Sequence, residues 1–103
     1  MKRTPLAIFT LATLALSGQA WADQAMAYAK NCMACHALDR KLVGPGFKDV
    51  AAKYAGDKTA IDKLATKIQK GGSGVWGPVP MPANTQVSEA DAKKLAAWVL
   101  TAK

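Results

Sequence analysis

The sequence predicts an all-α protein of three or four helices, and three observations lead to that prediction. Signals for β-strands are nearly absent after residue 22, where alanine and lysine are frequent. Apolar residues instead recur three and four positions apart within two segments, residues 57–71 and 88–100. Glycine, proline and capping residues separate these segments from the rest of the chain.

Residues 1–22 have the three-part layout of a secretory signal peptide. Lys2 and Arg3 precede an apolar run over residues 5–16, and Ala20-Trp21-Ala22 ends it with the small-x-small pattern of a cleavage site. The run is shorter than the roughly 20 residues of a membrane span, although an uncleaved anchor is the alternative. We therefore expect cleavage after Ala22, one domain over residues 23–103 without a membrane span, and a periplasmic location.

The chain is basic, but its charge does not form a nucleic-acid surface. Its formal net charge is +7, and loss of Lys2 and Arg3 lowers this by two. The remaining cations are spread out, and only Arg40-Lys41 and Lys93-Lys94 are adjacent. Since no basic stripe is interleaved with aromatic residues, we expect no nucleic acid as partner. The charge indicates solvation and steering toward an acidic protein, and we expect a monomer.

The first half of the mature chain predicts two short helices. One runs from about Gln24 into residues 32–36, with Asp23 placed as its N-cap. Residues 42–46 are a loop, because two glycines flank a proline. The second helix covers residues 47–55 and stops at Gly56.

The second half predicts two longer helices around an irregular segment. Asp57 is placed as the N-cap of the third helix, and Gly71 follows its end. One face of that helix is expected to be buried: Ile61, Leu64, Ala65 and Ile68. Ser88 opens the last helix, with Asp91 in an acidic variant of the capping box. Its inner stripe is Ala92, Leu95, Ala96 and Val99, with Trp98 beside them.

The segment between them, residues 71–87, is predicted to be irregular. It carries four glycines and three prolines. A loop of this length in a small domain is usually functional or disordered.

Both cysteines and the only histidine lie within Cys32-Met33-Ala34-Cys35-His36. A dithiol redox pair would need a neighbouring βαβ pattern, which is missing. A structural zinc site would need four ligands, and no other Cys or His is present. Cys-x-x-Cys-His is the attachment pattern of c-type haem, in which both thiols bond the macrocycle and His36 coordinates the iron. An exported chain with this motif favours the haem interpretation.

A second axial ligand is expected from a methionine, since Met/His ligation is the cytochrome c arrangement. Met33 lies inside the attachment motif, and Met26 is better explained as an apolar contact. Met81 lies between two prolines of the irregular segment, and each proline restricts the backbone around it. Such a loop presents a weak thioether ligand in a fixed position, although filling a core gap is the alternative role.

Two long segments, NCMACHALDRKLVGPGFKDVAAKYAG and GSGVWGPVPMPANTQVSEADAKKLAAWVLTAK, resemble the small bacterial class I cytochromes c of the cytochrome c-551 type. The resemblance covers nearly all of the mature chain. It implies the small cytochrome c fold, with three to four helices wrapped around one covalently attached haem c.

The resemblance also implies roles for three residues near the haem. Pro45 matches the proline whose carbonyl accepts a hydrogen bond from the proximal histidine, and Trp76 matches the tryptophan whose indole N–H reaches a haem propionate. Their alternative roles are a turn residue for Pro45 and packing for Trp76. Asn84 matches a region whose amide lies near the ligand methionine. Here the chain departs from the family, because Ala83 stands where a further proline is frequent.

A haem with both axial positions filled has no open site for substrate, which predicts an electron carrier rather than an enzyme. The resemblance implies periplasmic shuttling, with a nitrite reductase, terminal oxidase, peroxidase or quinol-oxidising complex as candidate partners. Two other classes stay open at this point. One is an enzyme or gas sensor in which Met81 is off the iron, and the other is a haem-free binding module closed by a Cys32–Cys35 disulfide.

Overall fold

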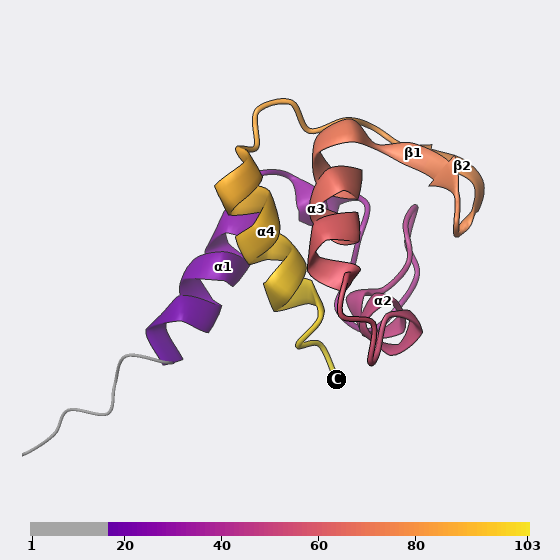
Figure 1. Cartoon of the computed structure of the whole chain (residues 1–103). Coiled ribbons are helices and arrows are strands. Elements are labelled where there is room, and N and C mark those ends of the chain that lie inside the picture. The colour runs from indigo at the N-terminus through magenta and orange to yellow at the C-terminus, as the bar shows by residue number, and fades with distance from the viewer. Residues whose placement is uncertain (1–16) are drawn as a thin grey trace, which may run out of the picture.

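A computed structural model describes residues 17–103 (Figure 1). Four α-helices, one 3₁₀ helix and one two-stranded sheet follow in the order α1 (Ser17–Ala29), η1 (Cys32–Ala34), α2 (Phe47–Lys53), α3 (Ala60–Lys70), β1 (Gly72–Gly74), β2 (Gly77–Met81) and α4 (Glu89–Val99). The predicted helical fold is confirmed, with a small hairpin added to it.

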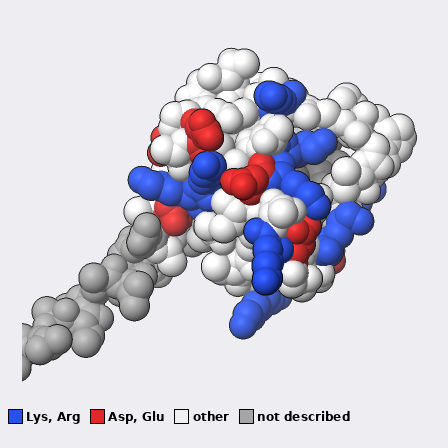
Figure 2. Space-filling model, viewed as in Figure 1, with Lys and Arg blue, Asp and Glu red and all other residues white. Residues whose placement is uncertain are grey.

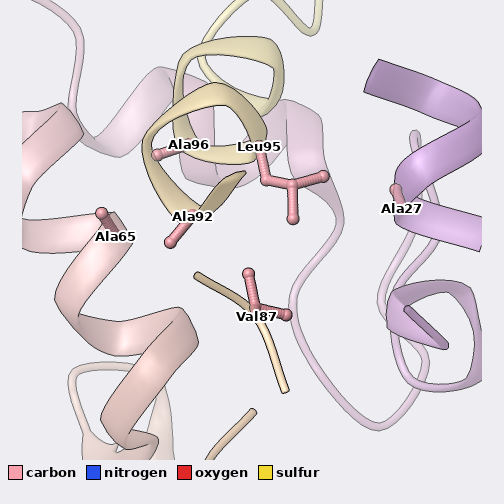
Figure 3. Packing of buried hydrophobic residues seen from close by; sticks show 6 residues of the cluster. All are labelled: Ala27, Ala65, Val87, Ala92, Leu95 and Ala96. Atoms are coloured by element: carbon pink, nitrogen blue, oxygen red, sulfur yellow. The ribbon is translucent and has the colours of Figure 1, made fainter. Parts of the chain in front are cut away.

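The core is built around α4, which packs against α3, α1 and α2. Its four predicted inner residues are all buried: Ala92, Leu95, Ala96 and Val99. Figure 3 shows three of them facing Ala65 of α3, Val87 and Ala27 of α1. Ser88 caps the helix as predicted, because its hydroxyl oxygen accepts a hydrogen bond from the Asp91 N–H at 3.1 Å.

A second cluster of buried residues lies beside the first and reaches toward the histidine. Phe47 and Val50 of α2 pack with Val99 of α4. The rings of Phe47 and Trp98 meet edge-on, with centroids 5.5 Å apart. This contact fixes α2 against the C-terminal end of α4, so that the start of α2 has a defined position.

The first helix begins earlier than the sequence predicts. It starts at Ser17, so Asp23 lies inside it and is not an N-cap. Helix-favouring Gln19, Ala20 and Ala22 extend the helix toward its N-terminus, but Trp21 is 74% exposed and the first buried residue is Ala27. The helix ends before the cysteine motif, because Asn31 adopts a left-handed conformation with φ 62° and η1 follows separately.

Residues 1–16 of the predicted signal peptide lie outside the described residues. Among the helices that the structure describes, none combines the length and the hydropathy that crossing a membrane requires.

The third helix begins two residues later than predicted, at Ala60, and its N-cap is Thr59 instead of Asp57. Asp57 instead closes the turn before it. Its carboxylate accepts hydrogen bonds from the Thr59 N–H at 2.8 Å, the Thr59 hydroxyl at 2.7 Å and the Lys63 ammonium at 2.9 Å. The predicted buried face is also narrower, because Ile61 is 41% exposed while Ala65 is buried.

These contacts make the stability of the folded protein depend on pH in the acidic range. The hydrogen bonds from Thr59, followed by those from Lys63, lower the pKa of Asp57 from 3.8 to about 2. Between these values the unfolded chain binds more protons than the folded one, so this stabilisation is complete above pH 3.8 and disappears as the pH falls toward 2. Asp57→Asn should therefore unfold with a weaker pH dependence than the parent between pH 4 and pH 2.

Denaturant unfolding of the holoprotein at several pH values measures this difference. Asp39→Asn is the control, because Asp39 is an exposed carboxylate whose ion pair is with its neighbour Arg40. Parallel pH profiles for the parent and Asp57→Asn would contradict the assignment.

The segment predicted to be irregular contains the β1–β2 hairpin. The strands are antiparallel, with Gly72 opposite Met81 and Gly74 opposite Gly77. All three glycines have positive φ, between 104° and 128°, which allows a tight turn that other residues rarely form. Prolines are tolerated in β2, because a strand in a two-stranded ribbon has one free edge that needs no N–H donor.

Candidate haem site

A cavity of about 220 Å³ lies between the cysteine motif and the hairpin. One wall comes from the motif and the loop after it, and the opposite wall comes from the hairpin. Lys67 of α3 also lines the cavity. The lining residues singled out by the sequence are Cys35, His36, Pro45, Trp76 and Met81. Residues that lie 45 positions apart in the chain, His36 and Met81, therefore face one space.

The imidazole of His36 is fixed on two sides. Its Nδ1 lies 2.8 Å from the Pro45 carbonyl oxygen, and its ring stacks on Phe47 with centroids 4.9 Å apart and planes 21° from parallel. A carbonyl oxygen only accepts hydrogen bonds, so Nδ1 carries the proton and donates it. Nε2 is then left with the lone pair that a metal requires.

Gly44 is needed beside this ring because a side chain would collide with it. A Cβ at Gly44 would lie 2.5 Å from His36 Cε1 and 2.9 Å from Nδ1. The ring cannot move aside easily, since Pro45 and Phe47 hold it.

Gly44→Ala is accordingly expected to weaken the His36–Pro45 hydrogen bond and to destabilise the holoprotein by about 1–3 kcal/mol, the usual cost of overpacking. Chemical denaturation gives the free energy, and the NMR signal of the Nδ1 proton reports on the hydrogen bond. Gly56→Ala is the control, because a Cβ there meets no atom within 4 Å and only its positive φ of 79° is strained. A Gly44→Ala variant with an unchanged Nδ1 proton signal would refute the steric argument.

The two cysteines are free thiols, and both are half-buried. Their helical turn brings His36 beside them, because the N–H groups of Cys35 and His36 both donate to the Cys32 carbonyl, at 3.2 and 3.0 Å. Cys35 lines the cavity, while Cys32 packs against the core. Burial raises the pKa of the Cys32 thiol. No cluster of three or more His, Cys, Asp or Glu side chains occurs among residues 17–103, so the described part of the chain offers no conventional zinc site.

Met81 ends β2 and is half-buried, unlike the exposed residues 72–80 before it. Trp76 stands at the tip of the hairpin and is 44% exposed, and the Lys53 ammonium lies 5.4 Å from its ring centroid. Asn84 does not line the cavity. Its Nδ2 donates to the Ile68 carbonyl at 3.0 Å and its backbone N–H reaches the same oxygen at 3.0 Å, which ties the end of the loop to α3.

Three residues near the cavity were not identified from the sequence. Phe47 stacks on the histidine, Gly44 leaves room for it, and Lys53 contacts Trp76. Phe47 directly follows the Gly-Pro-Gly loop, and an aromatic residue there was the one available signal. A lysine–tryptophan contact across 23 positions leaves no pattern in the sequence.

These residues fit a haem. The two thiols have the attachment spacing, and Cys35 lines the cavity together with an imidazole whose free lone pair is on Nε2 and a thioether on the opposite wall. A profile of the family described as "Cytochrome c" matches residues 22–103. The chain belongs to the cytochrome c family. As in that family, its cofactor is haem c, covalently attached, and its class is that of electron carriers.

Individual relatives are similar to this cytochrome in sequence and structure over most of its length. Cytochrome c-552 of Nitrosomonas europaea is 52% identical over 103 residues, covering 100% of both chains. Cytochrome c-551 of Azotobacter vinelandii is 64% identical over 74 residues, which are 72% of this chain and 89% of that relative. The crystal structure of Nitrosomonas europaea cytochrome c552 superimposes with a TM-score of 0.75 at 55% identity, covering 78% of this chain and 99% of that one. The small cytochrome c fold is thereby confirmed.

Proposed function

We propose that this cytochrome is a periplasmic one-electron carrier, not an enzyme, in a respiratory or denitrification-type chain. Cys32 and Cys35 would hold the haem through thioether bonds, and His36 and Met81 would coordinate its iron. The observation that carries the proposal is that one cavity has His36 on one wall and Met81 on the other. The roles of Pro45, Trp76 and Asn84 near the haem belong to the same proposal.

When bound, the haem supplies the reversible couple between ferric and ferrous iron. The chain's own residues keep the ligation the same in both states. Pro45 and Phe47 hold the imidazole in one orientation, and the hydrogen bond to Pro45 makes His36 a more basic ligand. Met81 is neutral and raises the potential relative to a second nitrogen ligand. An iron coordinated by both His36 and Met81 would have no position left for water or substrate, which supports a carrier over a catalyst.

The cavity rim supports a docking surface for redox proteins. Residues 71–87 contain no charged side chain, and the hairpin is white in Figure 2, whereas the neighbouring face carries several Lys and Arg side chains and a few acidic ones. Exposed apolar residues surround the cavity: Val43, Val75, Trp76 and Val79. An apolar centre with surrounding lysines suits brief contact with partners that carry acidic groups, and such electron-transfer interfaces are small.

Export is proposed from the signal-peptide pattern of residues 1–22. Three findings support it. The family match begins at residue 22. The crystal structure of Nitrosomonas europaea cytochrome c552 aligns with 78% of this chain, whereas the cytochrome c-552 sequence of that organism aligns with all of it. In addition, Trp21 and Ala22 are exposed, so the core does not require them. Mass spectrometry of protein from the periplasmic fraction should give a chain that starts at Asp23 and carries one haem.

The proposed carrier function is tested by measuring electron exchange with a soluble redox protein. The purified holoprotein should titrate as one reversible one-electron centre, and stopped-flow reduction by an acidic partner should slow as salt is added. An irreversible titration would overturn the carrier function. A rate that does not depend on salt would overturn the proposed charge steering.

A further inference from the structure

The hairpin that carries Met81 is fixed at its base and projects at its tip. At the base, the Gly71 N–H donates to the Lys67 carbonyl at 2.8 Å, and Asn84 binds the Ile68 carbonyl. Residues 72–80 are all exposed, and Gly72, Gly74 and Gly77 have positive φ. The tip therefore has few contacts of its own to hold it in place, and its backbone is rich in glycine, which favours local opening.

Lys53 makes the contact that joins this tip to the opposite side of the cavity. It is the last residue of α2, and its ammonium lies 5.4 Å from the centroid of the Trp76 ring. The same helix begins with Phe47, which stacks on His36. Within residues 17–103 no hydrogen bond or ion pair joins the hairpin tip to α2, and Lys53 has no carboxylate partner there.

We propose that Lys53 is a positioning residue for the methionine ligand: its cation–π contact with Trp76 holds the β1–β2 hairpin closed over the cavity. Because Trp76 and Met81 lie on the same hairpin, opening the tip loosens the wall that presents the thioether. The contact thus connects the wall that carries His36 to the wall that carries Met81. The inference rests on the proposed function, since it requires Met81 on the iron.

The size of the effect follows from the exposure of the contact. Cation–π contacts at exposed sites are modest, and a contact of this strength changes an opening equilibrium about two- to fivefold. A neutral competitor separates opening from charge effects, because imidazole, used at a pH where it is deprotonated, is not steered by the ammonium of Lys53. The measured quantity is the displacement of Met81 from ferric iron by imidazole, which is followed through the loss of the thioether–iron band in the far red.

Four holoproteins are compared: the parent, Lys53→Gln, Lys53→Arg and Lys48→Gln. Lys48 is the matched control, because it is an exposed lysine of the same helix with no aromatic ring under it in the described structure. Lys53→Gln should lower the imidazole concentration for half-displacement about two- to fivefold. Lys53→Arg, which keeps the cation–π contact, and Lys48→Gln should behave like the parent.

A double-mutant cycle isolates the contact itself. In a Trp76→Leu background, Lys53→Gln should have no further effect on displacement, because the ring is already gone. Three outcomes would overturn the positioning role of Lys53 and leave the proposed function intact. They are an unchanged displacement midpoint in Lys53→Gln, an equal shift in Lys48→Gln, and a full Lys53→Gln effect in the Trp76→Leu background. If the parent protein lacks the thioether–iron band, Met81 is not on the iron. That result would overturn the proposed function, and with it the positioning role of Lys53.

Discussion

Met81→Ala is expected to leave the haem attached and to open one axial position of the iron. The two thioether bonds and His36 remain, but the wall opposite the imidazole loses its only described thioether. The reduction potential should fall by on the order of 0.1 V, because methionine ligation raises haem potentials and axial ligands set them over a range of roughly 0.8 V. The ferrous variant should also bind carbon monoxide.

Met26→Ala is the control for this variant. Met26 is a methionine of the mature chain that packs against the core formed by α1, α3 and α4. Because Met26 is only half-buried, removing its side chain should lower the free energy of unfolding by less than the about 2–5 kcal/mol of a full core truncation, without changing axial ligation. If Met81→Ala keeps the parent's potential and its resistance to carbon monoxide, Met81 is not the ligand.

The second large effect is expected from preventing haem attachment. A Cys32→Ser/Cys35→Ser variant isolated without haem should lose cooperative folding. The reason is the small protein core: most of the buried hydrophobic residues are alanines, and Leu95 is the one large side chain that is fully buried among the described residues. A domain of this size with so little apolar burial depends on its cofactor for stability.

Circular dichroism during thermal unfolding measures this dependence. The holoprotein should show one cooperative transition, whereas the haem-free variant should show a broad change or little helical signal at 25 °C. A Ser88→Ala holoprotein, which loses a helix N-cap worth about 1 kcal/mol, provides the scale for an ordinary stability defect. A sharp transition in the haem-free variant, close to that of the holoprotein, would contradict the dependence.

Helix existence was predictable from the sequence, but helix boundaries were less so. The buried stripe of α4 follows from the spacing of Ala92, Leu95 and Val99, since an α-helix buries one face. The start of α3 was misplaced, because Asp57 binds backbone and side chain groups of a turn as readily as it caps a helix. The hairpin was missed because its pairing depends on glycines with positive φ, which leave no alternating pattern.

In the candidate site, too, some residues were predictable from the sequence and others were not. Covalent chemistry requires fixed residue types at fixed spacing, so the sequence predicts Cys32, Cys35 and His36 as the haem-binding residues. Lys53 and Gly44 act through space, on Trp76 and on the His36 ring, and only folding brings these groups together. The hydrogen bond from His36 to Pro45 agrees with what the family resemblance implied. The role of Asn84 beside the haem stays a prediction.

The most direct test of the central claim is the absorption spectrum of the purified ferric holoprotein, followed by exposure of the reduced protein to carbon monoxide. A haem held between His36 and Met81 predicts a low-spin ferric spectrum with a weak thioether–iron band in the far red, and no carbon monoxide binding by the ferrous form. A high-spin ferric spectrum, or ready binding of carbon monoxide, would contradict the account.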